Sequence, residues 1–313
     1  MHHHPLNSAK STPPAILSSE LSAGEGSSAG DAPVQKRGVP SPPLGPRRLP
    51  ELIPDRIEFG SRLVLVKKAQ TADMVLYLTH IKGKPTFIFV MGKLDPATAI
   101  EWRGAFKNRK GIILCDRDGV VKDSRFLDDA GKESAAEVMI PSALRAAKRA
   151  HEANIGLGIV TNQGGYQSGR MSFADTVAIN VRVVQQIANA GGRVDAVFIC
   201  PFTAALDGDG AGIYDARKPA PGMFLYASKL AAAHGIPVIA STGDQRTDGA
   251  AAQSAGQRFF AITGPSGRWQ AEVVSARQRD ERLPELNIDP ECYREVHEFA
   301  DVVEDVLTNC GGD

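Results

Sequence analysis

Residues 111–121 read GIILCDRDGVV, and this stretch decides the fold of the chain. Its first five residues carry no charged or strongly polar side chain, a pattern typical of a parallel strand that is buried on both faces. The run ends in Asp116 and Asp118, and Gly119 then permits a tight turn. The stretch therefore predicts a central strand with two carboxylates at its carboxyl end.

Short apolar runs of the same kind recur along the rest of the chain, with helical stretches between them. The further predicted strands are 155–160, 194–199, 237–241 and 258–262. The predicted helices are 141–151, 172–190, 222–234, 248–255 and 292–307. This alternation predicts a doubly wound α/β domain with a parallel sheet, whose ligand site lies at the carboxyl ends of the strands.

The first 105 residues do not follow this pattern. Residues 1–50 are rich in Ser, Pro, Ala and Gly and hold few large apolar side chains, so we expect a disordered tail. Residues 51–105 contain three apolar, β-branched runs, at 62–66, 74–81 and 86–91, followed by a short helix predicted at 96–106. We interpret 51–105 as a small β-rich subdomain of unknown role, ahead of the α/β domain at 106–313.

The composition excludes several classes of function. The 313 residues include 36 Lys and Arg against 36 Asp and Glu, a formal net charge of +0 that disfavours a protein coating nucleic acid or anionic membrane. The 4 cysteines show no close pairing, so no disulfide framework or zinc ribbon is expected. The sequence has no apolar run of about 18 residues. We expect a cytoplasmic protein without a membrane span, whose oligomeric state is open.

The acidic pair at Asp116 and Asp118 suits a divalent cation. Two carboxylates so close in the chain repel each other unless a cation holds them, and Mg²⁺ takes hard oxygen ligands from protein, water and phosphate. With such an ion present, Asp116 could attack a phosphorus atom while Asp118 exchanges a proton with the leaving oxygen. An ordinary Asp-rich turn after a strand is the structural alternative.

Groups suited to phosphate follow two further strands. Thr161 and Asn162 open a Gly-rich turn in which a hydroxyl and amides can hold phosphate oxygens. Arg217 and Lys218 precede the helix at 222–234 and offer a planar fork and a point charge for a phosphoryl group. Each motif alone also fits an ordinary turn or a solvated basic loop.

A third acidic position completes the pattern. Asp244 ends another predicted strand, where a further metal carboxylate is needed, and Asp248 one turn later supports the site or caps the helix. All four motifs fall at carboxyl ends of strands in one predicted sheet. Their conjunction is more specific than any single motif.

Taken together, these motifs resemble the four-motif signature of the haloacid dehalogenase (HAD) superfamily. The resemblance covers residues 110–264 and is carried by Asp-X-Asp-Gly at 116–119, Thr161, Lys218 and Gly-Asp-X-X-X-Asp at 243–248. The motif sequences DRDG, TNQGG and RKPAPGM resemble those of the branch of D-glycero-D-manno-heptose-1,7-bisphosphate and histidinol-phosphate phosphatases. The phosphatase half of polynucleotide kinase/3′-phosphatase has similar motif sequences.

The resemblance implies a role for each matching residue. It implies that Asp116 forms an aspartyl-phosphate, and that Asp118 protonates the leaving alkoxide and then activates the hydrolytic water. Thr161 and Lys218 would bind phosphoryl oxygens and neutralise charge in the transition state. Mg²⁺ would be held by Asp116, by the main-chain carbonyl of Asp118 and by Asp244.

The chain departs from the branch in places. Members often carry a zinc loop before the Arg-Lys-Pro motif, but only Cys200 stands there in this chain, so no zinc is expected. Ser168 stands where the branch usually has a basic residue, which bears on the identity of the substrate. The segments after the first and second motifs leave no room for a folded cap, so we expect a capless enzyme.

These observations predict a Mg²⁺-dependent phosphomonoesterase for a small phosphorylated metabolite of the sugar phosphate or bisphosphate type. A polynucleotide 3′-phosphatase would need a basic groove and stacking aromatics, whereas aromatic residues make up 6% of the chain. A catalytically silent scaffold is expected to have lost Asp116, Asp118 or Asp244, and all three are present. Both alternatives remain open.

Overall fold

The computed structural model describes the greater part of the chain from residue 49 onward. The described residues are 49, 53–59, 63–71, 73–92, 104–123, 138–202, 216–265, 269 and 288–310. All of them belong to one compact unit, Leu44–Asp313. The predicted tail therefore lies almost wholly outside the described residues. So does most of the helix predicted at 96–106, of which the described part, 104–106, forms turns.

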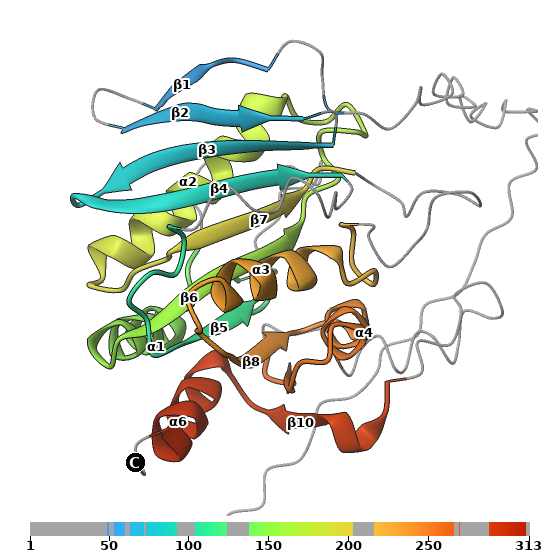
Figure 1. Ribbon diagram of the computed structural model, residues 1–313. Helices are drawn as coiled ribbons and strands as arrows, with labels where there is room; N and C mark the ends of the chain where they lie inside the picture. The colour runs from blue at the N-terminus through green and yellow to red at the C-terminus, as the bar shows by residue number, and fades with distance from the viewer. Residues whose placement is uncertain are drawn as a thin grey trace, which may run out of the picture. The chain divides into compact units, whose positions relative to one another are not determined.

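A ten-stranded sheet runs through the described part of the chain (Figure 1). The strand order is β1-β2-β3-β4-β7-β6-β5-β8-β9-β10. The strands are β1 Arg56–Phe59, β2 Leu63–Gln70, β3 Met74–Ile81, β4 Lys84–Met91, β5 Gly111–Cys115, β6 Ile155–Asn162, β7 Ala196–Cys200, β8 Val238–Gly243, β9 Phe259–Ile262 and β10 Tyr293–Val296. From β7 to β10 all neighbours are parallel, with β5 in the interior of the sheet. The predicted doubly wound α/β fold is confirmed.

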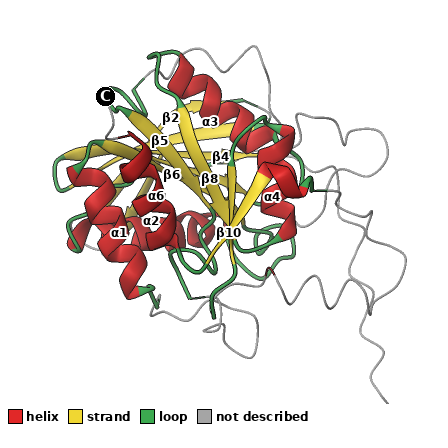
Figure 2. Ribbon diagram, turned by 90° about the horizontal axis from the view of Figure 1, so that it is seen from below, coloured by secondary structure: helices red, strands yellow, loops and turns green. Residues whose placement is uncertain are grey.

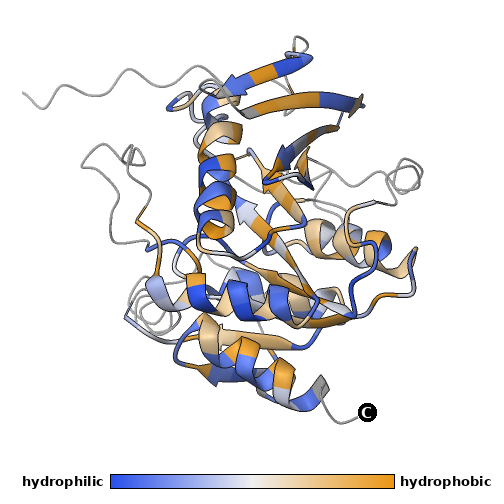
Figure 3. Ribbon diagram, turned by 90° about the vertical axis from the view of Figure 1, so that its left-hand side faces the viewer, coloured by the Kyte–Doolittle hydropathy of each residue, from blue (hydrophilic) through white to orange (hydrophobic). Residues whose placement is uncertain are grey.

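Helices cover both faces of this sheet. They are α1 Pro141–Glu152, α2 Phe173–Asn189, α3 Gly222–Ala232, α4 Arg246–Ser254 and α6 Phe299–Cys310. Figure 2 shows α1, α2 and α6 on one side of the strands and α3 and α4 on the other. In α1 the buried residues recur at helical spacing and are Ala143, Ala146, Ala147 and Ala150. Such an apolar stripe must face the sheet, and the hydropathy colours of Figure 3 show polar residues on the outer faces of the helices.

The predicted β-rich stretch forms strands β1 to β4, which pair antiparallel in sequence order. Strand β1 was not predicted. Strand β4 then pairs in parallel with β7, from Phe87 beside Ala196 to Val90 beside Ile199. The rings of Phe89 and Phe198 stack with their centroids 5.1 Å apart. Strands from both sides of residue 105 in the sequence therefore belong to one sheet. The domain limits at 50 and 105 stay predictions.

The predicted helix at 292–307 is wrong in its first part. Tyr293–Val296 forms β10, a parallel neighbour of β9, after a short 3₁₀ helix at Pro290–Cys292, and α6 begins only at Phe299. The apolar residue Val296 continues the helical spacing of α6 backwards, but its backbone pairs with Ile262 instead. Hydrophobic periodicity describes only the local segment, so it cannot show that a distant strand such as β9 will pair with it.

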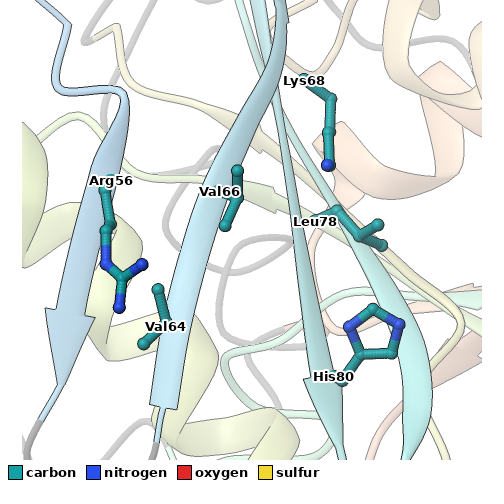
Figure 4. Close-up of a pocket in the computed structure, with 6 residues that line it drawn as sticks. All are labelled: Arg56, Val64, Val66, Lys68, Leu78 and His80. Atoms are coloured by element: carbon teal, nitrogen blue, oxygen red, sulfur yellow. The ribbon is translucent and has the colours of Figure 1, made fainter.

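Strands β1 to β4, which we call the meander, carry a hollow of about 350 Å³ on one face (Figure 4). It is lined by Arg56, Val64, Val66, Lys68, Leu78 and His80. These residues belong to β1, β2 and β3, which β4, β7 and β6 separate from β5 in the sheet. The hollow is therefore remote from the carboxyl end of β5.

Among the described residues, no helix is both long and apolar enough to cross a membrane. The cytoplasmic location stays a prediction.

Candidate active site

The parallel strands bring the predicted site residues to one edge of the sheet. Cys115, the last residue of β5, lies beside Ile159 of β6 and Thr242 of β8. The next backbone amide, that of Asp116, donates to the carbonyl of Thr242 at 2.9 Å. Because β6 and β8 continue past this level, Thr161 and Asp244 extend beyond the same edge.

Lys218 lies at the centre of the site. It precedes α3, and its Nζ donates to Asp116 Oδ1 at 2.6 Å and to the main-chain oxygen of Val160 at 2.9 Å. The same nitrogen lies 2.5 Å from Asp248 Oδ1. Burial alone would lower the pKa of Lys218, but Asp116 and Asp248 raise it above its ordinary value. Lys218 therefore stays positively charged inside the protein, which suits it to bind a phosphoryl group.

The carboxyl group of Asp116 has a raised pKa. Burial raises its pKa to about 7, and the opposing attraction of Lys218 does not cancel this effect, while Asp248 and Asp118 add to it. A buried carboxylate in this position gains from a further cation. The sequence pattern could not reveal this, because the partners come from distant segments.

A set of three carboxylates fits a divalent metal. One oxygen atom each from Asp116, Asp244 and Asp248 lies within 4.8 Å of the others, and all three residues are buried. Asp248 is already engaged on both oxygens, since Oδ1 meets Lys218 and Oδ2 accepts from the backbone amide of Gln245 at 3.0 Å. Asp116 and Asp244 are thus the carboxylates best placed for a cation, and hard oxygen ligands of this kind suit Mg²⁺.

Gly243 allows this arrangement. A Cβ atom at this position would lie 2.3 Å from Cβ and 2.4 Å from Cγ of Asp248, closer than two carbon atoms can approach. The end of β8 therefore needs a residue without a side chain so that Asp248 can reach Lys218.

Asp118 lies in a separate cradle of donors. The Arg117 guanidinium donates from Nη2 to Oδ2 at 2.8 Å, and Lys122 Nζ lies 3.5 Å from Oδ1. Burial alone would raise the pKa of Asp118, but Arg117 and Lys122 outweigh it and lower the pKa to about 2. Gly119 has φ of +81°, a left-handed conformation that turns the chain back toward Lys122. The free protein therefore holds Asp118 ionised.

Thr161 and Asn162 end β6 and have different surroundings. Thr161 is buried, and its Oγ1 accepts a hydrogen bond of 2.9 Å from Gln163. The side-chain amide of Asn162 instead clasps the backbone of Lys218, donating to its oxygen at 3.0 Å and accepting from its nitrogen at 3.1 Å. Asn162 therefore fixes the position of Lys218, and its role as a phosphate ligand stays a prediction.

Arg217 contacts the backbone just beyond the end of β7. Its Nη1 donates to the main-chain oxygen of Phe202 at 2.5 Å, which ties the segment before α3 to the end of β7. The phosphate-binding role of Arg217 stays a prediction too. The segment between them, 203–215, lies outside the described residues, and so does 124–137 after the first motif. The expected lack of a cap and of a zinc loop concerns these two segments.

The chain is similar to phosphatases from several bacteria. The chain is 34% identical over 163 residues to the D-glycero-beta-D-manno-heptose-1,7-bisphosphate 7-phosphatase of Bordetella bronchiseptica, which covers 50% of this chain and 83% of the relative. It is 30% identical over 176 residues to the enzyme of the same name from Vibrio cholerae, covering 53% of this chain and 89% of the relative. No protein-family model matches the chain.

One solved structure is also among the similar proteins. The crystal structure of D,D-heptose 1,7-bisphosphate phosphatase from B. bronchiseptica, complexed with magnesium and phosphate, aligns with a TM-score of 0.47 at 27% identity. The alignment covers 64% of this chain and 99% of that one.

The doubly wound sheet and its carboxylate-lysine site are those of a phosphatase of the HAD superfamily. Within that class, the chain belongs to the family of D-glycero-D-manno-heptose-1,7-bisphosphate 7-phosphatases.

Some residues of the site were missed by the sequence analysis. Gln163, Lys122 and Asn180 all contact Asp118 or its neighbour Arg117. Gln163 and Lys122 adjoin predicted motifs, so proximity in the chain could have drawn attention to them. Asn180 lies in the middle of α2, far from every motif, and only the fold reveals it.

Proposed function

We propose that the protein is a Mg²⁺-dependent phosphomonoesterase that hydrolyses a sugar phosphate or bisphosphate through an aspartyl-phosphate on Asp116. The observation that carries the proposal is the buried contact of Asp116 with Lys218, beside Asp244 and Asp248. A buried carboxylate next to a permanent cation can approach a phosphoryl group, because the cation offsets the charge of the phosphate oxygens.

The first half of the reaction transfers the phosphoryl group. Thr161 and Lys218 bind its oxygens, and an oxygen of Asp116 attacks phosphorus, forming a new P–O bond as the bond to the ester oxygen breaks. Asp118 gives its proton to the leaving alkoxide. Arg117 and Lys122 hold Asp118 ionised in the free protein, but a phosphate ester with two negative charges nearby raises the pKa of a carboxyl group and favours the protonated form.

The second half releases phosphate. Asp118, now ionised, takes a proton from water, and the resulting hydroxide attacks phosphorus. The P–O bond to Asp116 breaks, so that the carboxylate is regenerated and inorganic phosphate is released. The same carboxyl group thus acts as acid and then as base, and no proton is gained or lost by the protein over the cycle.

Asp116 and Asp244, with the main-chain carbonyl of Asp118, would hold Mg²⁺. When bound, this ion supplies positive charge that offsets the negative charge of the phosphoryl oxygens. The names of the relatives support a heptose bisphosphate as the substrate, cleaved at the 7-phosphate. Ser168, in the loop after β6, is a reason to test other sugar phosphates as well.

A phosphate-release screen tests this proposal. It would compare heptose bisphosphates, other sugar phosphates, histidinol phosphate, nucleotides and a 3′-phosphorylated oligonucleotide, each with Mg²⁺ and with excess EDTA. We expect Mg²⁺-dependent release that is fastest with a sugar phosphate or bisphosphate. Fastest release from the oligonucleotide would favour a 3′-phosphatase, and no release from any ester would favour a silent scaffold.

A further inference from the structure

Gln163 is a buried polar residue to which the proposed reaction gives no role. It follows Thr161 and Asn162 at the end of β6, and its backbone amide donates to the carbonyl of Cys200, the last residue of β7, at 2.7 Å. Its side chain is 8% exposed. The backbone of Gln163 is therefore fixed between two strands, and its side chain has a defined direction.

That direction is toward the two groups that flank the reacting phosphorus in the proposed mechanism. Gln163 Nε2 lies 2.9 Å from Thr161 Oγ1 and 3.3 Å from Asp118 Oδ2. A side-chain amide nitrogen carries two hydrogens, so it can donate to both oxygens at once. Gln163 is thus a bridge between the first and the second motif.

The bridge sets the direction of the Thr161 hydroxyl. A hydroxyl group donates one hydrogen and accepts through its lone pairs. Because Oγ1 accepts from Gln163, the hydroxyl hydrogen points elsewhere and is available to a phosphoryl oxygen. A hydroxyl that faced a second acceptor in the protein would lose this ability.

The bridge also restrains Asp118 from a second segment of the chain. Arg117 and Lys122, which contact the same carboxylate, belong to the first motif, and Arg117 is held in turn by Asn180 Oδ1 at 3.3 Å. Gln163 is the contact from the second motif. A carboxylate held by two separate segments has little freedom to rotate away from the leaving oxygen.

We propose that Gln163 is a positioning residue, which holds Asp118 in place for proton transfer and orients the Thr161 hydroxyl toward the phosphoryl group. This inference rests on the proposed function, because it assumes that Asp118 protonates the leaving group. Its consequence is a dependence on the leaving group. An alkoxide needs the proton from Asp118, whereas p-nitrophenolate is a stabilised anion that leaves without one.

The test compares two substrates in three variants. The variants are Gln163→Met, which keeps the length of the side chain without its donors, Gln163→Glu, which places a carboxylate against Asp118, and Gln253→Met as the matched control. Gln253 lies on α4, and its side-chain oxygen accepts a hydrogen bond from the backbone amide of Asp289. The substrates are the best sugar phosphate of the screen and p-nitrophenyl phosphate.

We expect Gln163→Met to lower kcat on the sugar phosphate by about 30-fold, part of the 10²- to 10⁴-fold that general acid catalysis supplies. On p-nitrophenyl phosphate kcat should fall by less than about threefold, since no proton is needed. KM should rise by a similar factor on both substrates, because both present a phosphoryl group to Thr161. Gln163→Glu should show a larger difference between the substrates, and Gln253→Met should show none.

Equal losses of kcat on both substrates would overturn the proposal, as would losses that follow a lowered Tm in both variants. If Gln163→Met fails to fold, Gln163→Glu, which keeps size and polarity, decides in the same way. A failure of the proposed function looks different, because the wild-type protein would then hydrolyse neither ester with Mg²⁺.

Discussion

Lys218 is the residue on which the site depends, and its position is set by groups from three other segments of the chain. Asn162 clasps its backbone, while Asp116 and Asp248 hold its ammonium group. A lysine side chain is long and flexible, so both of its ends must be held. The hydrogen bonds from Asn162 fix the backbone of Lys218, and the two carboxylates fix its ammonium group.

This gives a first prediction, on Asn162→Ala. Two hydrogen bonds are lost, each worth about 1 kcal/mol, and we expect kcat/KM to fall roughly tenfold or more as Lys218 moves. Steady-state phosphate release measures this, with Asn309→Ala, an exposed position on α6, as the control. A variant with wild-type kinetics would show that Asn162 does not position Lys218.

A second prediction concerns Asp116 and pH. In the metal-free protein burial raises the pKa of Asp116 to about 7, above the value of about 3.9 in an unfolded chain. The folded state therefore binds this proton more tightly. The resulting contribution to the free energy of unfolding is complete below about pH 4 and is lost as the pH rises through about 7.

Thermal unfolding in EDTA across this window measures the effect. We expect Asp116→Asn, which cannot ionise, to gain stability relative to the wild-type protein as the pH rises from about 5 to about 8. Adding Mg²⁺ should reverse the order at the higher pH, because the metal binds the ionised carboxylate. A stability difference that stays constant with pH would contradict the raised pKa.

At the scale of single elements, helix α2 supports the site from behind. Its N-cap Ser172 accepts from the backbone amide of Asp175 at 3.0 Å, and the side chain of Asp175 in turn accepts from the amide of Ser172. Two turns later Asn180 accepts a hydrogen bond from Arg117. The cap thus fixes the beginning of the helix that carries Asn180.

A third prediction follows, on Ser172→Ala. Loss of this cap should lower the free energy of unfolding by about 1 kcal/mol, since the backbone amide of Asp175 loses its acceptor. Urea denaturation measures the change. The fully folded variant should keep most of its kcat, because the helix is also held by its buried face; an unchanged stability would show that the cap is dispensable.

The elements also show how far the sequence can lead. Strand β5 was predicted with its observed limits, because a run of apolar residues that ends in a charged turn has only one interpretation in a parallel sheet. Strand β10 was predicted as helix, since Val296 fits both periods and only its pairing with β9 decides. Strand β1 is short and half polar, and it acquires its conformation from β2.

The site follows the same division. The sequence placed Asp116, Thr161, Lys218 and Asp244 at strand ends, and the structure brings these ends together. The contacts of Asn162, Gln163 and Asn180 could not be predicted, because each depends on the direction of a side chain across segments that are far apart in the chain.

At the scale of the whole molecule, the meander and the doubly wound sheet share one core. Phe89 of β4 stacks on Phe198 of β7 and meets Tyr226 of α3 edge-on at 5.2 Å. All three side chains are fully buried. Removing the meander would expose this cluster and the backbone of β7 to water.

A fourth prediction is therefore that deletion of residues 1–105 gives an unfolded or aggregated protein, and not merely one of altered selectivity. Phe89→Ala, a milder change, should lower the free energy of unfolding by about 3–5 kcal/mol. Denaturant unfolding measures it, and deletion of residues 1–43, which lie outside the described residues, is the control. A folded, active 106–313 fragment would refute this prediction.

The central claim is that Asp116 receives the phosphoryl group. The measurement that tests it most directly is Mg²⁺-dependent phosphate release from a sugar bisphosphate by the wild-type protein and by Asp116→Asn, side by side and with folding checked by circular dichroism. The account predicts that the variant folds and loses at least about a thousandfold in kcat, because an amide cannot replace the carboxylate as nucleophile. A folded variant with activity within about tenfold of the wild-type protein would contradict it.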